Sequence, residues 1–436
     1  MHKTLSLLVI TIWLLAMATA PAQSTEPQPR RPNVVFVLAD DLGIANLGCY
    51  GGDHVQTPNL DALAKGGTRY TRAFTVPLCG PSRALLLTGR YGFRTGAVNQ
   101  DQTGEIDPAR ETFLPKVLKA AGYATASIGK WGQLPKGPGE AGFDDYLRYS
   151  GSGVYWNTQE RGKTYIVNGE KRPLLDQQYM PDVMHAHLVE FMTKHRSEPF
   201  FVYYSLSHVH SDILPTPDSA PDSKDLYADN LAYLDKLVGK LIAELERLQL
   251  RDDTLVVFMG DNGTAKAWAA GATIGGRRLA GEKGSMQEGG GLVPLIANWP
   301  GTTPAGKVSA DLIDAADFFA TFAELAAAKL PAGVQLDSHS FAPQLRGEPG
   351  QPRGWVFNQL AKMWYVRDAG WKLNQAGELY DMSGAPFVEQ LVPADSTEPV
   401  AKAARVRLQQ VLAELDPAAG IQDQGDGTGR HRRNAK

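Results

Sequence analysis

Acidic residues follow two of the apolar runs in this sequence. The run at 33–39 is followed by Asp40 and Asp41, and the run at 254–259 is followed by Gly260, Asp261 and Asn262. Adjacent aspartates at a buried strand end repel each other and lose hydration unless a cation lies between them. Three carboxylates and an amide oxygen suit Ca²⁺ or Mg²⁺, whereas zinc prefers histidine or thiolate. Either cluster alone could cap a turn, but the two together predict a metal site.

A cysteine begins the second group of residues that could do chemistry, Cys79-Gly-Pro-Ser-Arg, which is followed by Leu-Thr-Gly at 87–89. Pro81 is tolerated in the first turn of a helix. Cys79 is therefore expected just ahead of a helix, near its positive end, where an anion is favoured. These residues fit a buried, unreactive cysteine beside an ordinary helix start equally well.

The elements that must position these residues are indicated by hydrophobic periodicity. Uninterrupted apolar runs are typical of strands covered on both faces, as in a mostly parallel sheet. Strands that alternate with helices predict an α/β fold with a wound sheet, and ligands bind beyond the carboxyl ends of its strands. The further strand-like runs lie at 124–128, 200–206 and 292–297, and the helical patterns at 60–65, 113–121, 183–195 and 231–248.

The segment around Cys79 resembles the signature of the formylglycine-dependent, type I sulfatases, an arylsulfatase-like family within the alkaline-phosphatase-like superfamily. Further segments resemble the family in the same order, and the resemblance covers about 32–415. It implies a mostly parallel sheet sandwiched by helices, with a small C-terminal antiparallel sheet. These segments are Asp40-Asp41-Leu-Gly, Thr57-Pro-Asn-Leu-Asp61, Gly129-Lys-Trp131, Asp261-Asn-Gly263 and 284–290 with Glu288.

The resemblance also implies a role for each site residue. Cys79 would be oxidised to formylglycine, whose hydrate is the nucleophile, and Arg83 would hold it. Lys130 and Lys283 would bind the sulfate oxygens, although an isolated lysine is usually a solvated surface charge. One divalent metal, usually calcium in this family, would be bound by Asp40, Asp41, Asp261, Asn262 and a formylglycine oxygen at Cys79.

Two histidines follow the run at 200–206. Alignment with the family places His210 at the sulfate-contacting position and leaves His208 as a supporting or structural residue, and the two share one face if the strand continues. The chain departs from the family pattern twice. Gly132 stands after Trp131 where the family has a histidine that assists the formylglycine, and Leu292 stands where the family often has arginine.

The chain is expected to be organised around one catalytic domain. Residues 1–22 are typical of a signal peptide, 23–31 of a linker, 32–345 of the catalytic domain, 346–416 of a small C-terminal subdomain and 417–436 of a disordered tail. The protein is therefore expected to be exported, periplasmic or secreted, with no membrane span once mature. A formylglycine-installing enzyme would act on it before export.

The expected substrate is a sulfate ester, first of a polysaccharide and second a small aryl sulfate. Two alternatives stay open: hydrolysis of phosphate or phosphonate esters at the same site, and an inactive member that binds sulfated glycans. The net charge of −3 gives no electrostatic case for nucleic acid as a partner. Residues outside the family segments that could line a substrate pocket are Arg94, Tyr155, Trp156 and Trp268.

Overall fold

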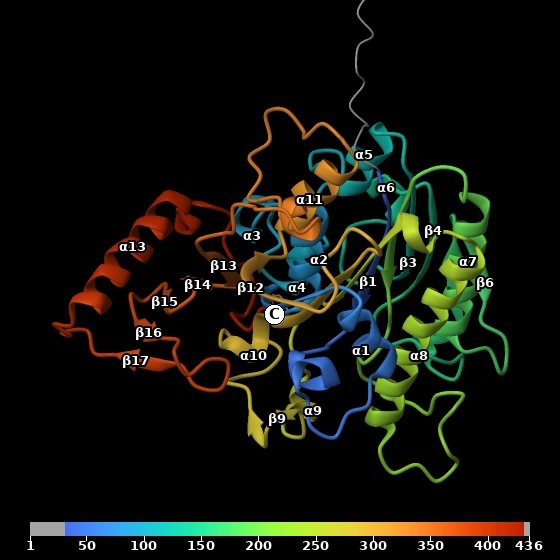
Figure 1. Cartoon of the computed structure of the whole chain (residues 1–436), viewed down its shortest axis with the longest axis horizontal. Helices are drawn as coiled ribbons and strands as arrows, with labels where there is room; N and C mark the ends of the chain where they lie inside the picture. Colours follow the sequence, from blue (N-terminus) through green and yellow to red (C-terminus); the bar gives the residue numbers. More distant parts are fainter. Residues whose placement is uncertain (1–30, 431–436) are drawn as a thin grey trace, which may run out of the picture. The chain divides into compact units, whose positions relative to one another are not determined.

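The computed structural model describes residues 31–430. Its centre is a mixed sheet of ten strands in the order β12-β2-β11-β8-β1-β7-β3-β4-β5-β6 (Figure 1). Strand β1 lies between β7 and β8 and is parallel to both, and β3 and β4 continue the parallel part. The strands are β1 Asn33–Ala39, β2 Thr68–Phe74, β3 Ala124–Lys130, β4 Asp145–Tyr149, β5 Thr164–Val167, β6 Glu170–Pro173, β7 Phe200–Ser205, β8 Thr254–Gly260, β11 Leu292–Asn298 and β12 Lys307–Asp314.

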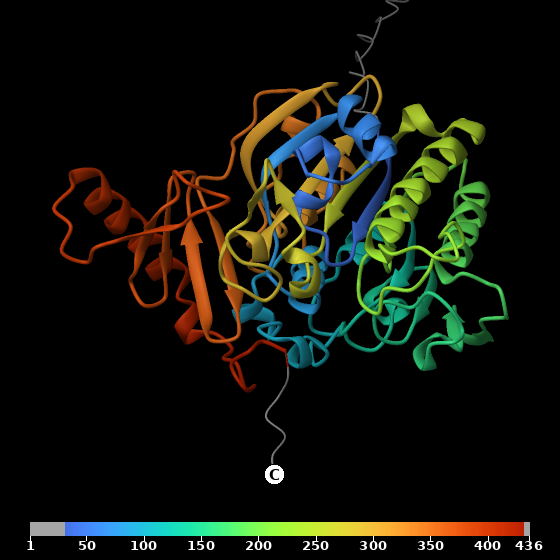
Figure 2. The ribbon, with the colours of Figure 1, turned by 90° about the horizontal axis from the view of Figure 1, so that it is seen from below.

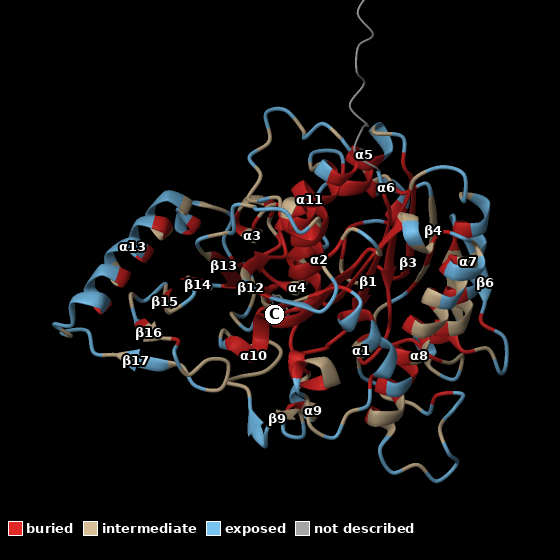
Figure 3. Cartoon of the chain, viewed as in Figure 1, coloured by how far each residue is buried: buried red, intermediate tan, exposed pale blue. Residues whose placement is uncertain are grey.

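The predicted wound, mostly parallel sheet is confirmed. All five apolar runs form strands of it, although β11 is antiparallel to both of its neighbours, β2 and β8. Along β1 the side chains alternate between two hydrophobic cores. Val34 and Phe36 lie in one core, and Val35 and Val37 lie in the other. The central strands are accordingly buried, whereas the outer surfaces of the covering helices carry exposed residues (Figure 3).

Helices cover both faces of the sheet. Apolar residues of α2 (Cys79–Thr88), α5 (Leu114–Ala120) and α11 (Asp317–Leu325) belong to one core. Those of α1 (Pro58–Lys65), α7 (Met180–Lys194) and α8 (Leu226–Arg247) belong to the other. The shorter elements are α3 Gly92–Thr95, α4 Gln100–Thr103, α6 Pro138–Ala141, α9 Lys266–Ala269, α10 Glu288–Gly291, α12 Ala342–Leu345, and the two-stranded β9 Thr273–Ile274 with β10 Arg277–Arg278.

A second sheet follows, as predicted for the C-terminal part of the chain. Its five strands are all antiparallel, and α13 (Pro399–Leu415) packs on it through Ala404 and Leu408. None of the helices in residues 31–430 is long and apolar enough to span a bilayer. The strands are β13 Val356–Leu360, β14 Met363–Arg367, β15 Trp371–Asn374, β16 Leu379–Asp381 and β17 Gln390–Val392.

Residues 417–430, which the sequence predicts as part of a disordered tail, make hydrogen bonds to residues between 93 and 102. The backbone N–H of Ile421 donates to the Phe93 carbonyl (2.7 Å), and Asp423 is buried and accepts from Asn99. Figure 2 shows this red C-terminal segment beside the blue-green helices that follow α2. These contacts are hydrogen bonds of backbone and polar side-chain groups. The small number of apolar side chains in the segment does not predict them. The predicted signal peptide, most of the linker and residues 431–436 lie outside the described residues.

Candidate active site

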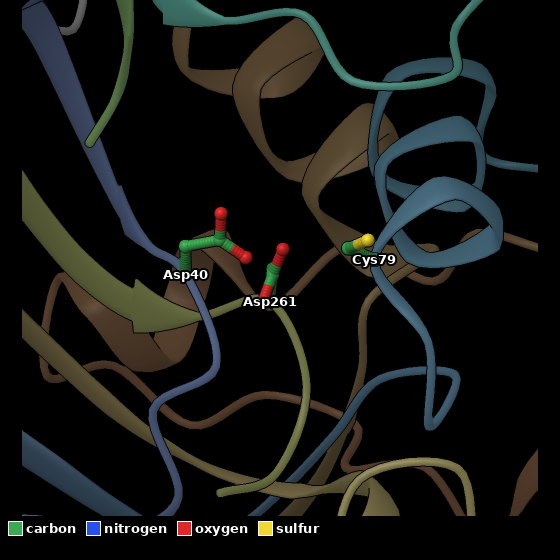
Figure 4. A group of neighbouring side chains, drawn as sticks. All are labelled: Asp40, Cys79 and Asp261. Atoms are coloured by element: carbon green, nitrogen blue, oxygen red, sulfur yellow. The ribbon is translucent and has the colours of Figure 1, made fainter. Parts of the chain in front are cut away.

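The carboxyl ends of β1 and β8 bring the two acidic clusters together. Ala39 pairs with Gly260, so Asp40 and Asp261 follow directly at neighbouring strand ends. The Asp41 N–H donates to Asp261 Oδ1 (3.0 Å). Figure 4 shows Asp40 and Asp261 at these strand ends beside Cys79, the first residue of α2. Ligand atoms of Asp40, Cys79 and Asp261 all lie within 4.8 Å of one another.

The oxygen atoms at this edge could hold a cation. Asp40, Asp261 and Asn262 are fully buried. Within residues 31–430, Asp40 Oδ1 and Asn262 Oδ1 are buried oxygens without a hydrogen-bond partner. Buried polar atoms are rarely left unpaired unless water or an ion satisfies them. The donor set therefore fits a hard divalent cation.

Two lysines contact the acids directly. Lys130, the last residue of β3, is fully buried and donates to Asp40 Oδ2 (2.6 Å), and Lys283 contacts Asp41 Oδ1 (2.5 Å). Burial by itself would raise the pKa of Asp40, but Lys130 and the neighbouring cations outweigh it and lower that pKa. Burial likewise opposes the charge of Lys130, and Asp40 raises its pKa. Both groups are thus charged at neutral pH.

Arg83 orients one of the acids. Its guanidinium is fully buried and donates twice to Asp261 Oδ2, from Nη2 (2.8 Å) and Nε (3.1 Å). Its remaining nitrogen, Nη1, donates to the Lys130 carbonyl and to the hydroxyls of Tyr203 and Ser205. Tyr203 and Ser205 lie on β7. The sequence marks this strand only as an apolar run, and nothing in that pattern distinguishes the two hydroxyl groups as functional.

The two histidines lie in different environments. Strand β7 ends at Ser205, so the alternation expected for His208 and His210 does not apply. His208 is fully buried, its Nε2 is 2.9 Å from the Tyr179 hydroxyl, and burial lowers its pKa to about 3. His210 faces the site: its Nε2 lies 3.9 Å from Asp41 Oδ2, and its side chain is 20% exposed.

Gly132 has a backbone conformation that favours glycine, with a φ of +70°. A Cβ there would have room, since its nearest neighbours, Arg83 Cδ and Lys130 Cε, are 3.6 Å away. The side chain that reaches Cys79 comes from Gln100 in α4, whose Nε2 donates to Cys79 Sγ (3.2 Å). Gln100 lies in no motif, and no feature of the sequence marks it.

The four residues suggested for a substrate pocket are engaged in packing or pairing. The hydroxyl of Tyr155 donates to the carbonyls of Ser207 and His210. Trp268 stacks on Tyr227, with ring centroids 4.8 Å apart. The indole of Trp156 donates to the Pro215 carbonyl, and Arg94 pairs with Asp337.

Comparisons with known proteins agree on one family. The family model described as Sulfatase matches residues 32–328. Arylsulfatase A of Homo sapiens is 35% identical to this chain, covering 79% of the chain and 72% of that protein. N-acetylgalactosamine-6-sulfatase of Homo sapiens is 32% identical, covering 74% and 67%. The crystal structure of Ps i-CgsB in complex with k-i-k-neocarrahexaose is 28% identical with a TM-score of 0.75, covering 93% of this chain and 96% of that chain.

Proposed function

This chain belongs to the sulfatase family and is a sulfuric ester hydrolase, and from that premise we propose that it uses a formylglycine made from Cys79 together with one divalent cation, Ca²⁺ before Mg²⁺. The observation that carries the proposal is the convergence of Asp40, Asp261 and Cys79 at one buried sheet edge. The unpaired oxygens of Asp40 and Asn262 support the cation, because an all-oxygen set suits calcium or magnesium. Asp41 completes the proposed ligands.

In this proposal Asp40, Asp41, Asp261 and Asn262 would hold the cation, which would supply positive charge beside the reacting oxygens, and hydrated formylglycine would supply the nucleophilic hydroxyl. Lys130 and Lys283 reduce the negative charge that shields the sulfur, since both ammonium groups already face the acids at this edge. Arg83 keeps Asp261 in one orientation through its two hydrogen bonds.

His210 is the proposed general acid that protonates the leaving alcohol. It faces the acids and is partly exposed, so a substrate can approach it. His208 is too deeply buried to meet a substrate and has a lowered pKa. It supports the site structurally through Tyr179.

The proposed substrate is a sulfate ester of a carbohydrate. Support comes from the similarity to N-acetylgalactosamine-6-sulfatase and to the structure solved with neocarrahexaose. An aryl sulfate is the second candidate, on the similarity to arylsulfatase A. Phosphate and phosphonate esters present similar tetrahedral anions to the same cations. We further propose that residues 1–22 direct export and that a formylglycine-installing enzyme acts beforehand.

The test begins with the mass of the peptide that contains Cys79. Formylglycine replaces the thiol with an aldehyde, and Cys79→Ala is expected to abolish turnover in a folded protein. Rates on matched sulfate, phosphate and phosphonate esters identify the preferred reaction, and sulfated oligosaccharides compared with an aryl sulfate identify the substrate class. Unmodified Cys79 in a fully active enzyme, or binding of sulfated glycans without turnover, would contradict the proposal.

A further inference from the structure

Gln100 is placed to act on the nucleophile. Within residues 31–430, the hydrogen bond that reaches Cys79 Sγ comes from Gln100 Nε2, at 3.2 Å. The three cationic groups nearby are already engaged with acids: Lys130 with Asp40, Lys283 with Asp41 and Arg83 with Asp261. Gly132, on the loop that follows Lys130, contributes no side chain.

The orientation of the Gln100 amide is set by its surroundings. The backbone N–H of Gly80 donates to Gln100 Oε1 (3.0 Å), so the opposite orientation would place two donors against each other. The Nε2 group is therefore the one that faces Cys79. The absence of a side chain at Gly80 makes room for the Gln100 amide. A Cβ on Gly80 would lie only 2.7 Å from Gln100 Oε1.

The C-terminal segment 421–430 holds α4 in position. The backbone N–H of Gln100 donates to the Gly429 carbonyl (2.8 Å). Asn99 caps α4 by accepting from the Gln102 N–H (2.7 Å) and donates through its amide to Asp423. The N–H of Gln424 donates to Gln102 Oε1 (2.8 Å). A four-residue helix has little stability by itself, so these contacts determine where Gln100 lies.

We propose that Gln100 donates a hydrogen bond to the formylglycine oxygen that takes the place of Cys79 Sγ and orients the nucleophile, and that segment 421–430 keeps Gln100 there. This inference rests on the proposed function. A primary amide neither gains nor loses a proton near neutral pH, so Gln100 positions an oxygen and transfers no proton. The hydrate carries one oxygen more than the aldehyde, and a fixed donor beside it favours the hydrate.

The experiment compares Gln100→Leu and Gln100→Glu with the wild-type full-length protein. Gln100→Glu preserves the shape of the side chain but removes the donor, which covers the case in which Gln100→Leu fails to fold. The matched control is Gln410→Leu, because Gln410 is an exposed residue of α13 whose side chain donates only to Glu414 among the described residues. Three quantities are measured: conversion of Cys79 by peptide mass, the rate at which an aminooxy probe labels the native protein, and kcat with KM.

We expect equal conversion of Cys79 in all variants. Both Gln100 variants should be labelled faster, because loss of the donor favours the free aldehyde. Their kcat should fall about 10- to 100-fold, the usual effect of leaving a buried hydrogen-bonding group without its partner, with KM little changed. Gly80→Ala, which crowds the amide, and Asp423→Ala, which loosens α4, should move labelling and kcat in the same direction by less.

The inference would be overturned if Gln100→Glu, with Cys79 converted to formylglycine, had the labelling rate and kcat of the wild-type protein. That result would leave the proposed function intact. Absence of formylglycine from active wild-type protein would overturn both. A loss of kcat without faster labelling would show that Gln100 acts on packing alone and would also contradict the inference.

Discussion

Two clusters of buried charge differ in how completely their atoms are paired. The site cluster comprises the acids Asp40, Asp41 and Asp261 with the cations Lys130, Lys283 and Arg83. The subdomain cluster joins α10 to the C-terminal sheet: Arg367 Nη1 donates to both oxygens of Glu288 (2.5 and 2.6 Å), and Lys372 donates to Glu389. The second oxygen of Glu389 accepts from the Glu288 N–H (2.8 Å).

The subdomain cluster leaves no buried polar side-chain atom of its four residues unpaired, whereas the site cluster leaves Asp40 Oδ1 without a partner. A cavity of about 580 Å³ borders Glu288 and Arg367, yet none of the predicted site residues lines it. An unpaired buried oxygen therefore distinguishes the proposed site cluster from the subdomain cluster, although the large cavity borders the subdomain cluster. Complete pairing is what a cluster with a structural role requires, because each unmatched buried charge is costly.

The largest expected effect is on activity in the site cluster. Asp261→Asn removes one charge from the proposed metal ligands and weakens the anchor of Arg83. We expect kcat/KM to fall by at least about 10²–10³, the scale of losing one preorganised electrostatic group, with bound metal lost in parallel. Kinetics and metal analysis of the purified variant measure both. A variant that keeps its activity after losing its metal would contradict the comparison.

The second effect is on stability in the subdomain cluster. Glu288→Gln leaves Arg367 buried without a full counter-charge, and breaking a buried pair typically costs about 3–5 kcal/mol. Denaturant unfolding should show this loss, while the kcat of the folded protein stays unchanged. Arg172→Gln, which breaks an exposed pair with Glu170, is the control and should change stability little. Unchanged stability in Glu288→Gln would remove the contrast between the clusters.

Added calcium should stabilise the wild-type protein through the site cluster alone. A ligand at 100 times its Kd stabilises the folded state by about 2.7 kcal/mol, and chelation should reverse the shift in Tm. Glu288→Gln should show the same shift from its lower starting Tm, whereas Asp40→Asn should show none. An equal shift in Asp40→Asn would place the cation elsewhere.

The effect that is smallest at neutral pH lies outside both clusters. Burial lowers the pKa of His208 to about 3, below its ordinary value near 6.5. Between these values the unfolded state binds the proton more readily, so His208 destabilises the fold as pH falls from about 6.5 towards 3, by up to ~1.4 kcal/mol per pH unit. Unfolding of His208→Gln measured at several pH values should show a shallower slope. Gln410→Leu, which removes no titratable group, should leave the slope unchanged.

The sequence by itself determined the sheet and the place of the proposed site. Apolar runs could be assigned to buried strands because both faces of the sheet are covered. Strand β1 ends at Ala39 as predicted, and β8 extends one residue beyond the predicted run to Gly260, so that Asp40 and Asp261 follow the strands directly. Parallel neighbours bring their carboxyl ends to one edge. The acids, Lys130 and Cys79 are therefore neighbours at that edge as a consequence of local patterns.

Only the tertiary structure decided which side chains complete the site. His208 and His210 lie in different environments because β7 ends at Ser205, before either histidine. The alternation of side chains along a strand does not predict where the strand ends. Gln100 reaches Cys79 from a four-residue helix, and segment 421–430 makes hydrogen bonds to that helix. The hydrogen bonds of segment 421–430 join residues more than 300 positions apart, and they are made by polar groups that follow no periodic pattern in the sequence. Hydrophobic patterning predicts what is buried, whereas such pairings exist only once the packed elements bring the partners together.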